Sequence, residues 1–137
     1  MSEPRTGGCL CGAVQYDFDA APIAAVHCHC SDCQKATGSG FATVFGLPET
    51  QLNLRGDTHL GSFSLTAESG QQVTRQFCRE CGSPLFTLAE NNPGFIWIKA
   101  GSLDDPRWLQ PTDSCWTQSA VPWAPADAQL IHHPGNP

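Results

Sequence analysis

Positive charge is scarce in this chain, which carries seven Lys and Arg against 13 Asp and Glu, giving a formal net charge of −6. A nucleic-acid-binding protein normally has a basic face, so we expect no nucleic-acid partner. Long apolar runs are also missing, since no stretch approaches the ~20 apolar residues that a membrane-spanning helix needs. The first residues, MSEPRTGGCLCG, lack the apolar segment of a signal peptide. Together these absences favour a cytoplasmic protein with no membrane partner.

A sustained helical period is absent as well, and short alternating patterns typical of strands take its place. Residues 14–18 alternate apolar with polar side chains, and GFIWIKAGSL is rich in β-branched and aromatic residues. The other strand candidates are IAAVHCHC, FATVFGL, QLNL, SFSL, VTRQF and LFTLA. Two short helices are predicted, SDCQKATG with Ser31 as N-cap and Gly38 at its end, and SLDDPRW with Ser102 as N-cap.

The length of 137 residues suits one domain with a core of its own. We therefore predict a mainly β fold, a single domain over residues 1–137 built from several small antiparallel sheets. Its core is expected to span about residues 7–125, followed by a C-terminal tail over 126–137. The last residues, HHPGNP, are expected to fray.

Cysteine is abundant, and the positions of the cysteines carry most of the functional signal. Seven of the eight fall into three tight groups, C-x-C, C-x-C-x2-C and C-x2-C, and one stands alone. Disulfides are disfavoured because no export signal is present and the clustered cysteines are odd in number. A redox pair at C-x2-C would precede a long helix, whereas CRECGSPLF has the pattern of a turn leading into a strand. The eight cysteines are Cys9, Cys11, Cys28, Cys30, Cys33, Cys78, Cys81 and Cys115.

Two of these groups together supply four sulfurs for a structural zinc site. FCRECGSPLF is a zinc-knuckle pattern in which Cys78 and Cys81 flank a turn. Cys9 and Cys11 are two residues apart, and in an extended strand they point to the same face. A zinc ion held by these four cysteines would fasten the N-terminus to the middle of the chain. Structural zinc contributes on the order of 10–16 kcal/mol in small domains, so its removal is expected to unfold much of the protein.

The third group, Cys28, Cys30 and Cys33, lacks an evident fourth ligand. Strand parity places His27 and His29 on the face opposite to Cys28 and Cys30, which argues against a histidine ligand. A lone cysteine such as Cys115 is more often a small buried hydrophobe. The remaining interpretation is three protein ligands and one open coordination position, as in catalytic zinc sites.

An open position beside three thiolates favours a particular chemistry. Three thiolates leave a divalent zinc ion with a net charge near −1, which makes it a poor generator of hydroxide. Such an ion suits a soft ligand, and binding deprotonates a thiol whose ordinary pKa is ~8.5. The predicted result is a sulfur nucleophile available at neutral pH.

Four motifs in order resemble the glutathione-dependent formaldehyde-activating enzyme family, a zinc-binding β-rich domain. The matching pieces are GGCLCGAVQY, CHCSDCQKATGSGF, FCRECGSPLF and AGSLDDP, which together span residues 7–106. The combination of three cysteine groups with ATGS and AGSLDDP is highly specific, whereas one C-x2-C alone would be a weak signal.

The resemblance implies a β-tent-like fold of several sheets around a structural zinc, with two Zn2+ ions per chain. By position, Cys9, Cys11, Cys78 and Cys81 match the structural site of the family, and Cys28, Cys30 and Cys33 match its catalytic site. The implied activity is that of S-(hydroxymethyl)glutathione synthase, a carbon–sulfur lyase. It condenses a zinc-bound small thiol, glutathione or similar, with formaldehyde or another small aldehyde.

The C-terminal region departs from the pattern of the resembled family. Members often carry a histidine and later a lysine before a tryptophan, and here Ser114 and Ala120 occupy those positions while Trp123 is kept. The departure bears on substrate identity, because an anionic thiol would need a cation at its carboxylates. The candidates for that cation are Lys35, Arg75, Arg79, Lys99 and Arg107.

Other roles near the three-cysteine group follow from its neighbours in sequence. Attack of the thiolate on the aldehyde would leave a negatively charged oxygen. The candidates to protonate it are His27 and His29, and Ser39 and the backbone of Gly38 and Gly40 could donate hydrogen bonds to it. The aromatic candidates for the pocket wall are Phe41, Phe45 and Trp97.

Two alternatives to this enzyme remain open. One is a non-catalytic, zinc-stabilised β module that binds a protein partner, and the other is a redox pair formed by Cys30 and Cys33. A single tightly held zinc ion would favour the binding module over the enzyme. A Cys30–Cys33 disulfide that forms reversibly in the native protein would favour the redox pair. The sequence makes no prediction of oligomeric state.

Overall fold

The computed structural model describes residues 4–137, so the first three residues of the predicted domain lie outside it. Over this range the fold is mainly β, as predicted, with strands from the N-terminal to the C-terminal part of the chain. The strands are β1 (Arg5–Gly8), β2 (Gln15–Phe18), β3 (Ala24–Cys28), β4 (Ala42–Pro48), β5 (Asn53–Arg55), β6 (Leu60–Thr66), β7 (Gln72–Cys78), β8 (Pro84–Ala89), β9 (Phe95–Lys99), β10 (Asp113–Cys115) and β11 (Ile131–His132). One α-helix, α1 (Ser31–Thr37), and four 3-10 helices, Glu49–Gln51, Asp57–His59, Ala100–Ser102 and Thr117–Ser119, complete the described elements.

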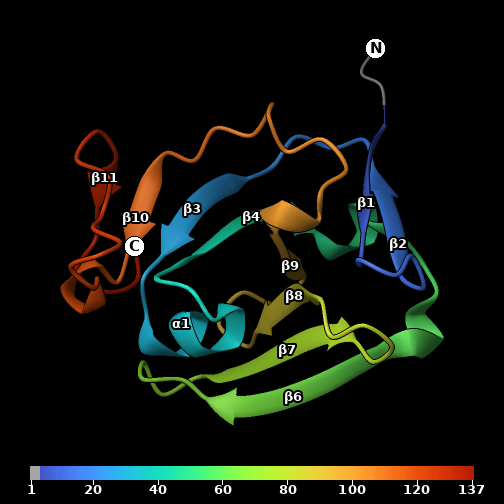
Figure 1. Cartoon of the computed structure of the whole chain (residues 1–137), viewed down its shortest axis with the longest axis horizontal. Helices are drawn as coiled ribbons and strands as arrows, with labels where there is room; N and C mark the ends of the chain where they lie inside the picture. Colours follow the sequence, from blue (N-terminus) through green and yellow to red (C-terminus); the bar gives the residue numbers. More distant parts are fainter. Residues whose placement is uncertain (1–3) are drawn as a thin grey trace.

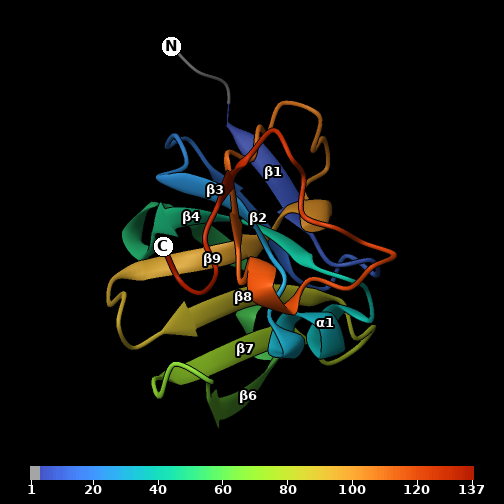
Figure 2. The ribbon, with the colours of Figure 1, turned by 90° about the vertical axis from the view of Figure 1, so that its left-hand side faces the viewer.

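The strands form two sheets of unequal size. Strands β1, β2 and β5 make a three-stranded sheet, and the others make an eight-stranded sheet in the order β11-β10-β3-β4-β9-β8-β7-β6. Figure 2 shows β3, β4, β9, β8, β7 and β6 in succession down the large sheet, with α1 in front of its lower half. Figure 1 shows α1 between the end of β3 and β7, on the concave side of the large sheet. The pairings are antiparallel except at β10, which pairs in parallel with both β3 and β11.

The two faces of β4 serve two different parts of the molecule. Phe45 and Leu47 are fully buried in the main core, where the ring of Phe45 lies 5.5 Å from that of Phe18 on β2. Val44, which points to the opposite face, packs with Cys33 in a second and smaller cluster. Adjacent residues of a strand point to opposite faces, so the large sheet separates the main core from the face that carries the cysteines of β3 and α1.

The structure corrects two local predictions and confirms a third. The N-cap of α1 is Cys30 and not Ser31, because the Cys30 sulfur accepts the hydrogen bond from the Cys33 N–H. The segment after Ser102 forms no helix, since Ser102 ends a 3-10 turn and its hydroxyl donates to the Lys99 carbonyl at 2.7 Å. The predicted end of α1 is right, because Gly38 adopts the left-handed conformation with φ of 70°.

The C-terminal segment was expected to fray, but its residues from β11 to Asn136 make contacts with the rest of the fold. β11 adds to the edge of the large sheet through β10, and the His133 N–H donates to the Ser114 carbonyl at 2.8 Å. Trp116 anchors the residues beyond β11, because its Nε1 donates to Asn136 Oδ1 at 2.8 Å. The prediction missed this because β10 and β11 are short, and their pairing partners are distant in sequence.

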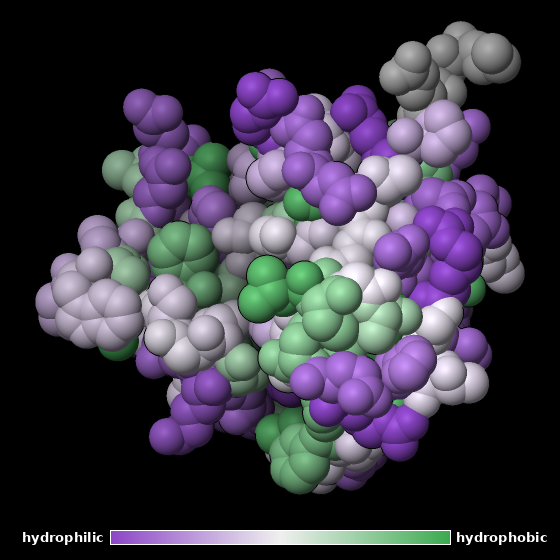
Figure 3. Space-filling view, turned by 45° about the vertical axis from the view of Figure 1, so that its right-hand side comes forward, coloured by the Kyte–Doolittle hydropathy of each residue, from purple (hydrophilic) through white to green (hydrophobic). Residues whose placement is uncertain are grey.

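The surface carries no broad apolar band on the face of Figure 3. Hydrophobic residues lie on that face in several separate groups, in the centre, at the lower edge and toward the left, with hydrophilic residues between them. Among the described residues, no helix is long and apolar enough to cross a membrane.

Candidate active site and metal centres

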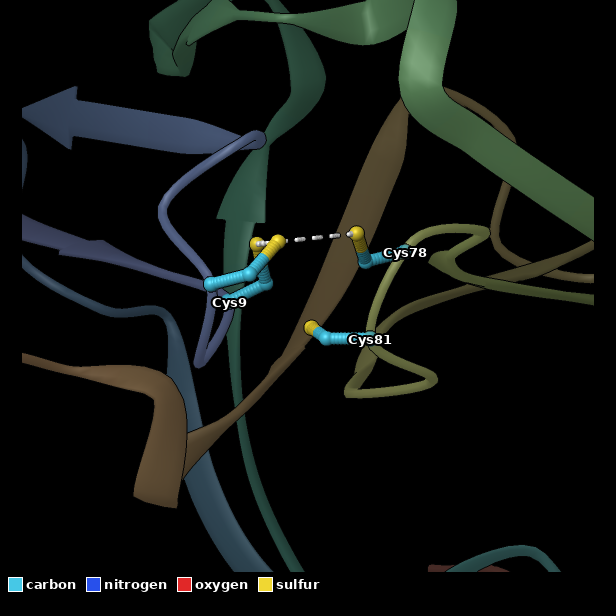
Figure 4. Close-up of side chains that lie close together, drawn as sticks. Cys9, Cys78 and Cys81 are labelled. Atoms are coloured by element: carbon cyan, nitrogen blue, oxygen red, sulfur yellow. Dashed lines mark hydrogen bonds between the residues drawn. The ribbon is translucent and has the colours of Figure 1, made fainter.

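Four cysteines from two distant turns meet beside the three-stranded sheet. Cys9 and Cys11 belong to the turn between β1 and β2, while Cys78 is the last residue of β7 and Cys81 lies in the turn that leads to β8. Their four sulfurs all lie within 4.8 Å of one another. Figure 4 shows the side chain of Cys9 pointing toward those of Cys78 and Cys81 from the facing turn.

The spacing of these sulfurs fits a tetrahedral zinc ion. A tetrahedral site with Zn–S bonds of about 2.3 Å places its sulfurs about 3.8 Å apart. The Sγ atoms of Cys9 and Cys11 are 3.7 Å apart, and those of Cys11 and Cys78 are 3.8 Å apart. Backbone N–H groups of Val14 and Glu80 donate to the sulfurs of Cys9 and Cys78, both at 3.3 Å, and such bonds favour thiolates. This group could therefore hold a metal ion.

The geometry that brings Cys9 and Cys11 together differs from the predicted one. β1 ends at Gly8, so the two cysteines lie in a turn and not on one face of a strand. The turn is closed by the Cys9 N–H, which donates to the Val14 carbonyl at 3.0 Å. In the partner turn Gly82 has φ of 81°, a conformation that favours glycine and lets its N–H reach the Cys78 carbonyl.

The second group of sulfurs forms where β3 passes into α1. The sulfurs of Cys28, Cys30 and Cys33 lie within 4.8 Å of one another. Cys28 is the last residue of β3, Cys30 caps α1, and Cys33 lies in the first turn of that helix. The Cys33 N–H donates to the Cys30 sulfur at 3.2 Å, which stabilises a negative charge on that sulfur. This group, with its three soft donors, could also hold a metal ion.

No fourth side-chain ligand completes this group among residues 4–137. The two neighbouring histidines point to the other face, in agreement with strand parity. The ring of His27 lies 4.8 Å from Phe41 and its Nδ1 is hydrogen-bonded to Thr43, and the ring of His29 lies 5.0 Å from Phe41. His29 is buried with no hydrogen-bond partner for either ring nitrogen.

Cys115 is adjacent to the three-sulfur group but outside it. It pairs with Cys28 in the parallel register of β10 and β3, so both side chains share a face of the sheet. Its sulfur does not belong to the set that lies within 4.8 Å, and burial raises the pKa of its thiol to about 11. Cys115 is thus a neutral neighbour of the site at physiological pH.

The three-sulfur group lines a cavity of about 490 Å³. Apolar walls come from Val26, Val44 and Trp97, and the far rim carries amide and hydroxyl side chains. Of the three aromatic residues proposed for the wall, only Trp97 lies there. Phe45 is in the main core and Phe41 contacts the histidines on the opposite face. Ser39, Gly38 and Gly40 do not line this cavity either.

Two of the five candidate cations reach the cavity, Arg75 from β7 and Lys99 from β9. Arg75 Nη2 lies 3.9 Å from Cys33 Sγ, and Lys99 Nζ donates to Thr87 Oγ1 at 3.0 Å. The other three are placed elsewhere: Arg79 donates to the Thr58 carbonyl, Arg107 pairs with Asp105, and Lys35 is exposed on α1. The signal that could have found Lys99 was its spacing of two residues from Trp97 on a predicted strand.

Cys33 has the lowest pKa of the three thiols, mainly because the other two donate hydrogen bonds to it. Hydrogen bonds from the Cys28 and Cys30 thiols lower the pKa of Cys33 to about 2, and the positive charges of Arg75 and Lys99 act in the same direction. The pKa of Cys28 is raised, because its proton is the one shared with the other two sulfurs. Burial lowers the pKa of Lys99, while the negative charge at Cys33 opposes that effect.

The positions at which the chain departs from the resembled family lie away from the cavity wall. Ser114 pairs with His27 in the sheet and is fully buried on the same face as that histidine. Neither Ser114 nor Ala120 lines the cavity, and Trp123 is 73% exposed.

A mainly β fold with two convergent cysteine groups defines a class of small metal-binding domain. Within that class, the family model of the glutathione-dependent formaldehyde-activating enzyme matches residues 4–119. The chain belongs to this family, which confirms the resemblance seen in its motifs.

Two individual proteins are similar to the chain. A curated protein of Podospora anserina, named putative glutathione-dependent formaldehyde-activating enzyme, is 25% identical over 118 residues. That match covers 82% of this chain and 54% of the relative, so the chain spans about half the length of that protein. A crystal structure of a Rhodobacter sphaeroides protein is 24% identical with a TM-score of 0.60, covering 77% of this chain and 97% of that one. This second likeness supports the fold.

Proposed function

We propose that the chain is a zinc-dependent carbon–sulfur lyase of the formaldehyde-activating type, resembling S-(hydroxymethyl)glutathione synthase. Its substrates are glutathione or a similar small thiol and formaldehyde or another small aldehyde. One observation carries the proposal: the group of Cys28, Cys30 and Cys33 opens on a cavity and has no fourth side-chain ligand among residues 4–137. Membership of the family supports the choice of thiol and aldehyde.

Two zinc ions per chain are part of the proposal, one for each cysteine group. Cys9, Cys11, Cys78 and Cys81 hold the structural ion, and Cys28, Cys30 and Cys33 hold the catalytic one. A zinc ion in the three-sulfur group would lower the pKa of an incoming thiol from its ordinary ~8.5, so that the thiolate exists at neutral pH. The donor sets fit this division, because structural sites are closed and catalytic sites keep a free position.

The residues of the chain position the reactants. In the forward direction a thiolate sulfur forms a bond to the carbonyl carbon, the C=O π bond breaks, and the oxygen takes a proton. The Cys33 N–H and the Arg75 guanidinium fix the sulfurs of Cys30 and Cys33, so the open side of the group faces the cavity. Val44 and Trp97 form an apolar wall that limits the water around the reacting carbon.

The chemistry requires a compartment in which thiols stay reduced, and we propose the cytoplasm. The eight cysteines are free in the structure, all within residues 4–137. Oxidation of any ligand cysteine would remove a thiolate that the metal needs.

Metal analysis combined with exchange NMR of the thiol–formaldehyde adduct tests the proposed function. The wild-type protein is expected to hold two zinc ions and to accelerate exchange above the spontaneous rate. Cys30→Ser is expected to hold one and to lose the acceleration. Cys115→Ser is the matched control, because Cys115 lines the same cavity outside the three-sulfur group, and its exchange is expected to persist.

The same measurements separate the alternatives. Equal exchange in wild type and Cys30→Ser would sink the catalytic proposal and leave the family assignment intact. One tightly held zinc ion, with no response to added thiol, would instead support the non-catalytic module.

A further inference from the structure

Lys99 stands in a row of residues that crosses the concave face of the large sheet. It pairs with Val44 on β4, and Val44 pairs with Val26 on β3. Residues paired across neighbouring strands project to the same face, so the three side chains lie side by side. The three-sulfur group lines the same cavity as all three.

The ammonium group of Lys99 is buried without a carboxylate partner. The residue is 8% exposed, and no acidic oxygen among residues 4–137 lies within 4.0 Å of its Nζ. Of the three acidic side chains that line the cavity, Asp113 pairs with His133, Glu68 is exposed, and Asp32 lies in the first turn of α1. A buried charge is unfavourable without opposite charge nearby, and here the opposite charge is that of the Cys33 thiolate in the same cavity, with no carboxylate to pair with the ammonium group directly.

Lys99 also has spare hydrogen-bonding capacity. An ammonium group has three N–H donors, and the structure engages one of them with Thr87 Oγ1 at 3.0 Å. Arg75, the other cation of the cavity, is directed to Cys33 Sγ. His27 and His29, which the sequence offered as donors, contact Phe41 on the opposite face. The structure therefore leaves two N–H donors of Lys99 free to meet a substrate oxygen.

We propose that Lys99 donates a hydrogen bond to the carbonyl oxygen of the aldehyde and stabilises the negative charge that grows there. This inference rests on the proposed function and adds to it the residue that meets the reacting oxygen. As the S–C bond forms, the π electron pair of the C=O bond moves onto the oxygen beside the ammonium group. Water entering the cavity then supplies the proton of the product hydroxyl, which replaces the proton that the thiol released.

Lys99→Met tests the role, because it keeps the aliphatic stem and removes the charge and the donors. Removing one donor to a developing oxyanion typically lowers kcat by about 100-fold or more. We expect a loss of that size in the exchange rate at saturating thiol and aldehyde. Zinc content, measured by metal analysis, is expected to stay at the wild-type level. The affinity for the thiol, measured by the absorption of cobalt-substituted protein, is expected to change by less than about twofold.

Two further variants control the experiment. Lys35→Met removes an exposed lysine of α1 that does not line the cavity, and it is expected to exchange at the wild-type rate. Lys99→Arg keeps the positive charge and is expected to retain more of the rate than Lys99→Met. If Lys99→Met fails to fold, Lys99→Gln gives the same comparison with a neutral polar side chain.

The outcomes are distinct from those that test the proposed function. Wild-type exchange in Lys99→Met, alongside no exchange in Cys30→Ser, would overturn the inference alone. A loss confined to the thiol affinity would also overturn it, because Lys99 would then bind the thiol and not the reacting oxygen. A wild-type protein with no exchange above the spontaneous rate would overturn both.

Discussion

The two cysteine groups use the same donor atoms in opposite surroundings. The four-sulfur group joins segments whose cysteines Cys11 and Cys78 are 67 positions apart, and its four sulfurs are enough for a tetrahedral ion. The three-sulfur group comes from one short stretch, Cys28 to Cys33, and faces a cavity with two cations beside it. Cross-linking distant segments stabilises a fold, whereas a local group with a free side adds little cross-linking and is accessible to a ligand. We therefore expect the four-sulfur group to contribute mainly to stability and the three-sulfur group mainly to reactivity.

The largest expected effect comes from Cys78→Ser in the closed group. Loss of a structural zinc removes on the order of 10 kcal/mol, which compares with the whole stability of a domain. We expect the variant to lose its near-UV circular dichroism and its cooperative thermal transition. A variant that kept both at the wild-type level would contradict the structural role that we assign to the four-sulfur group.

Cys33→Ser in the open group is expected to act on activity. The exchange rate should fall to the spontaneous background, and one zinc ion per chain should be lost. The fall in melting temperature should be smaller than that of Cys78→Ser, because the three sulfurs link only β3 to α1. Parallel thermal melts of the two variants measure this difference directly. Equal destabilisation would mean that both groups are structural.

A smaller effect is expected from Tyr16→Phe in the main core. The Ser102 hydroxyl donates to the Lys99 carbonyl, so Tyr16 must donate to Ser102 Oγ, at 2.7 Å. Burial raises the pKa of Tyr16 to about 12, so the phenol stays protonated and able to donate. Removing this bond should lower the free energy of unfolding by about 1 kcal/mol, measured by urea denaturation. An unchanged midpoint would show that this bond adds nothing to the stability of the core.

The smallest effect is expected from Asp113→Asn at the rim of the cavity. Hydrogen bonds from Thr112 and then His133 lower the pKa of Asp113 below its ordinary 3.8. A carboxyl with a depressed pKa stabilises the fold above its ordinary pKa, and the contribution is lost as pH falls through the lower, folded value. The variant should thus melt below wild type at neutral pH, by less than Tyr16→Phe does, and the gap should close in acid. Comparing variant with wild type at each pH cancels any common loss of metal, and a gap that persists in acid would contradict the assignment.

Local patterns predicted most of the fold. Alternation located β2 and β4, and the β-branched and aromatic residues located β9. A glycine located the end of α1 at Gly38. Alternation could not predict β10, because a strand of three residues is too short to show a pattern. It forms through parallel pairing with β3, which lies far upstream in the sequence. β1 was missed for another reason, since its two glycines have low strand propensity. A side chain at Gly7 would collide with the Tyr16 ring and hydroxyl, so glycine fits this position.

For the candidate site, the sequence predicted the sulfurs better than their surroundings. Spacing along the chain was enough to group Cys28, Cys30 and Cys33, and parity correctly excluded His27 from the group. The cations could not be assigned, because Arg75 and Lys99 reach the cavity from strands that are neighbours only through β8. Their placement depends on the register of the whole sheet, which no local pattern contains.

Cys30 has two roles, one in the three-sulfur group and one at the start of α1. Its sulfur belongs to the three-sulfur group and also accepts the first hydrogen bond of α1, from the Cys33 N–H. Alkylation or oxidation of that sulfur would weaken the acceptor and loosen the start of the helix in the same event. The amide resonance of Cys33 in a nitrogen-15 spectrum is therefore a built-in reporter, which would register damage or occupancy at the sulfurs without any label attached to them.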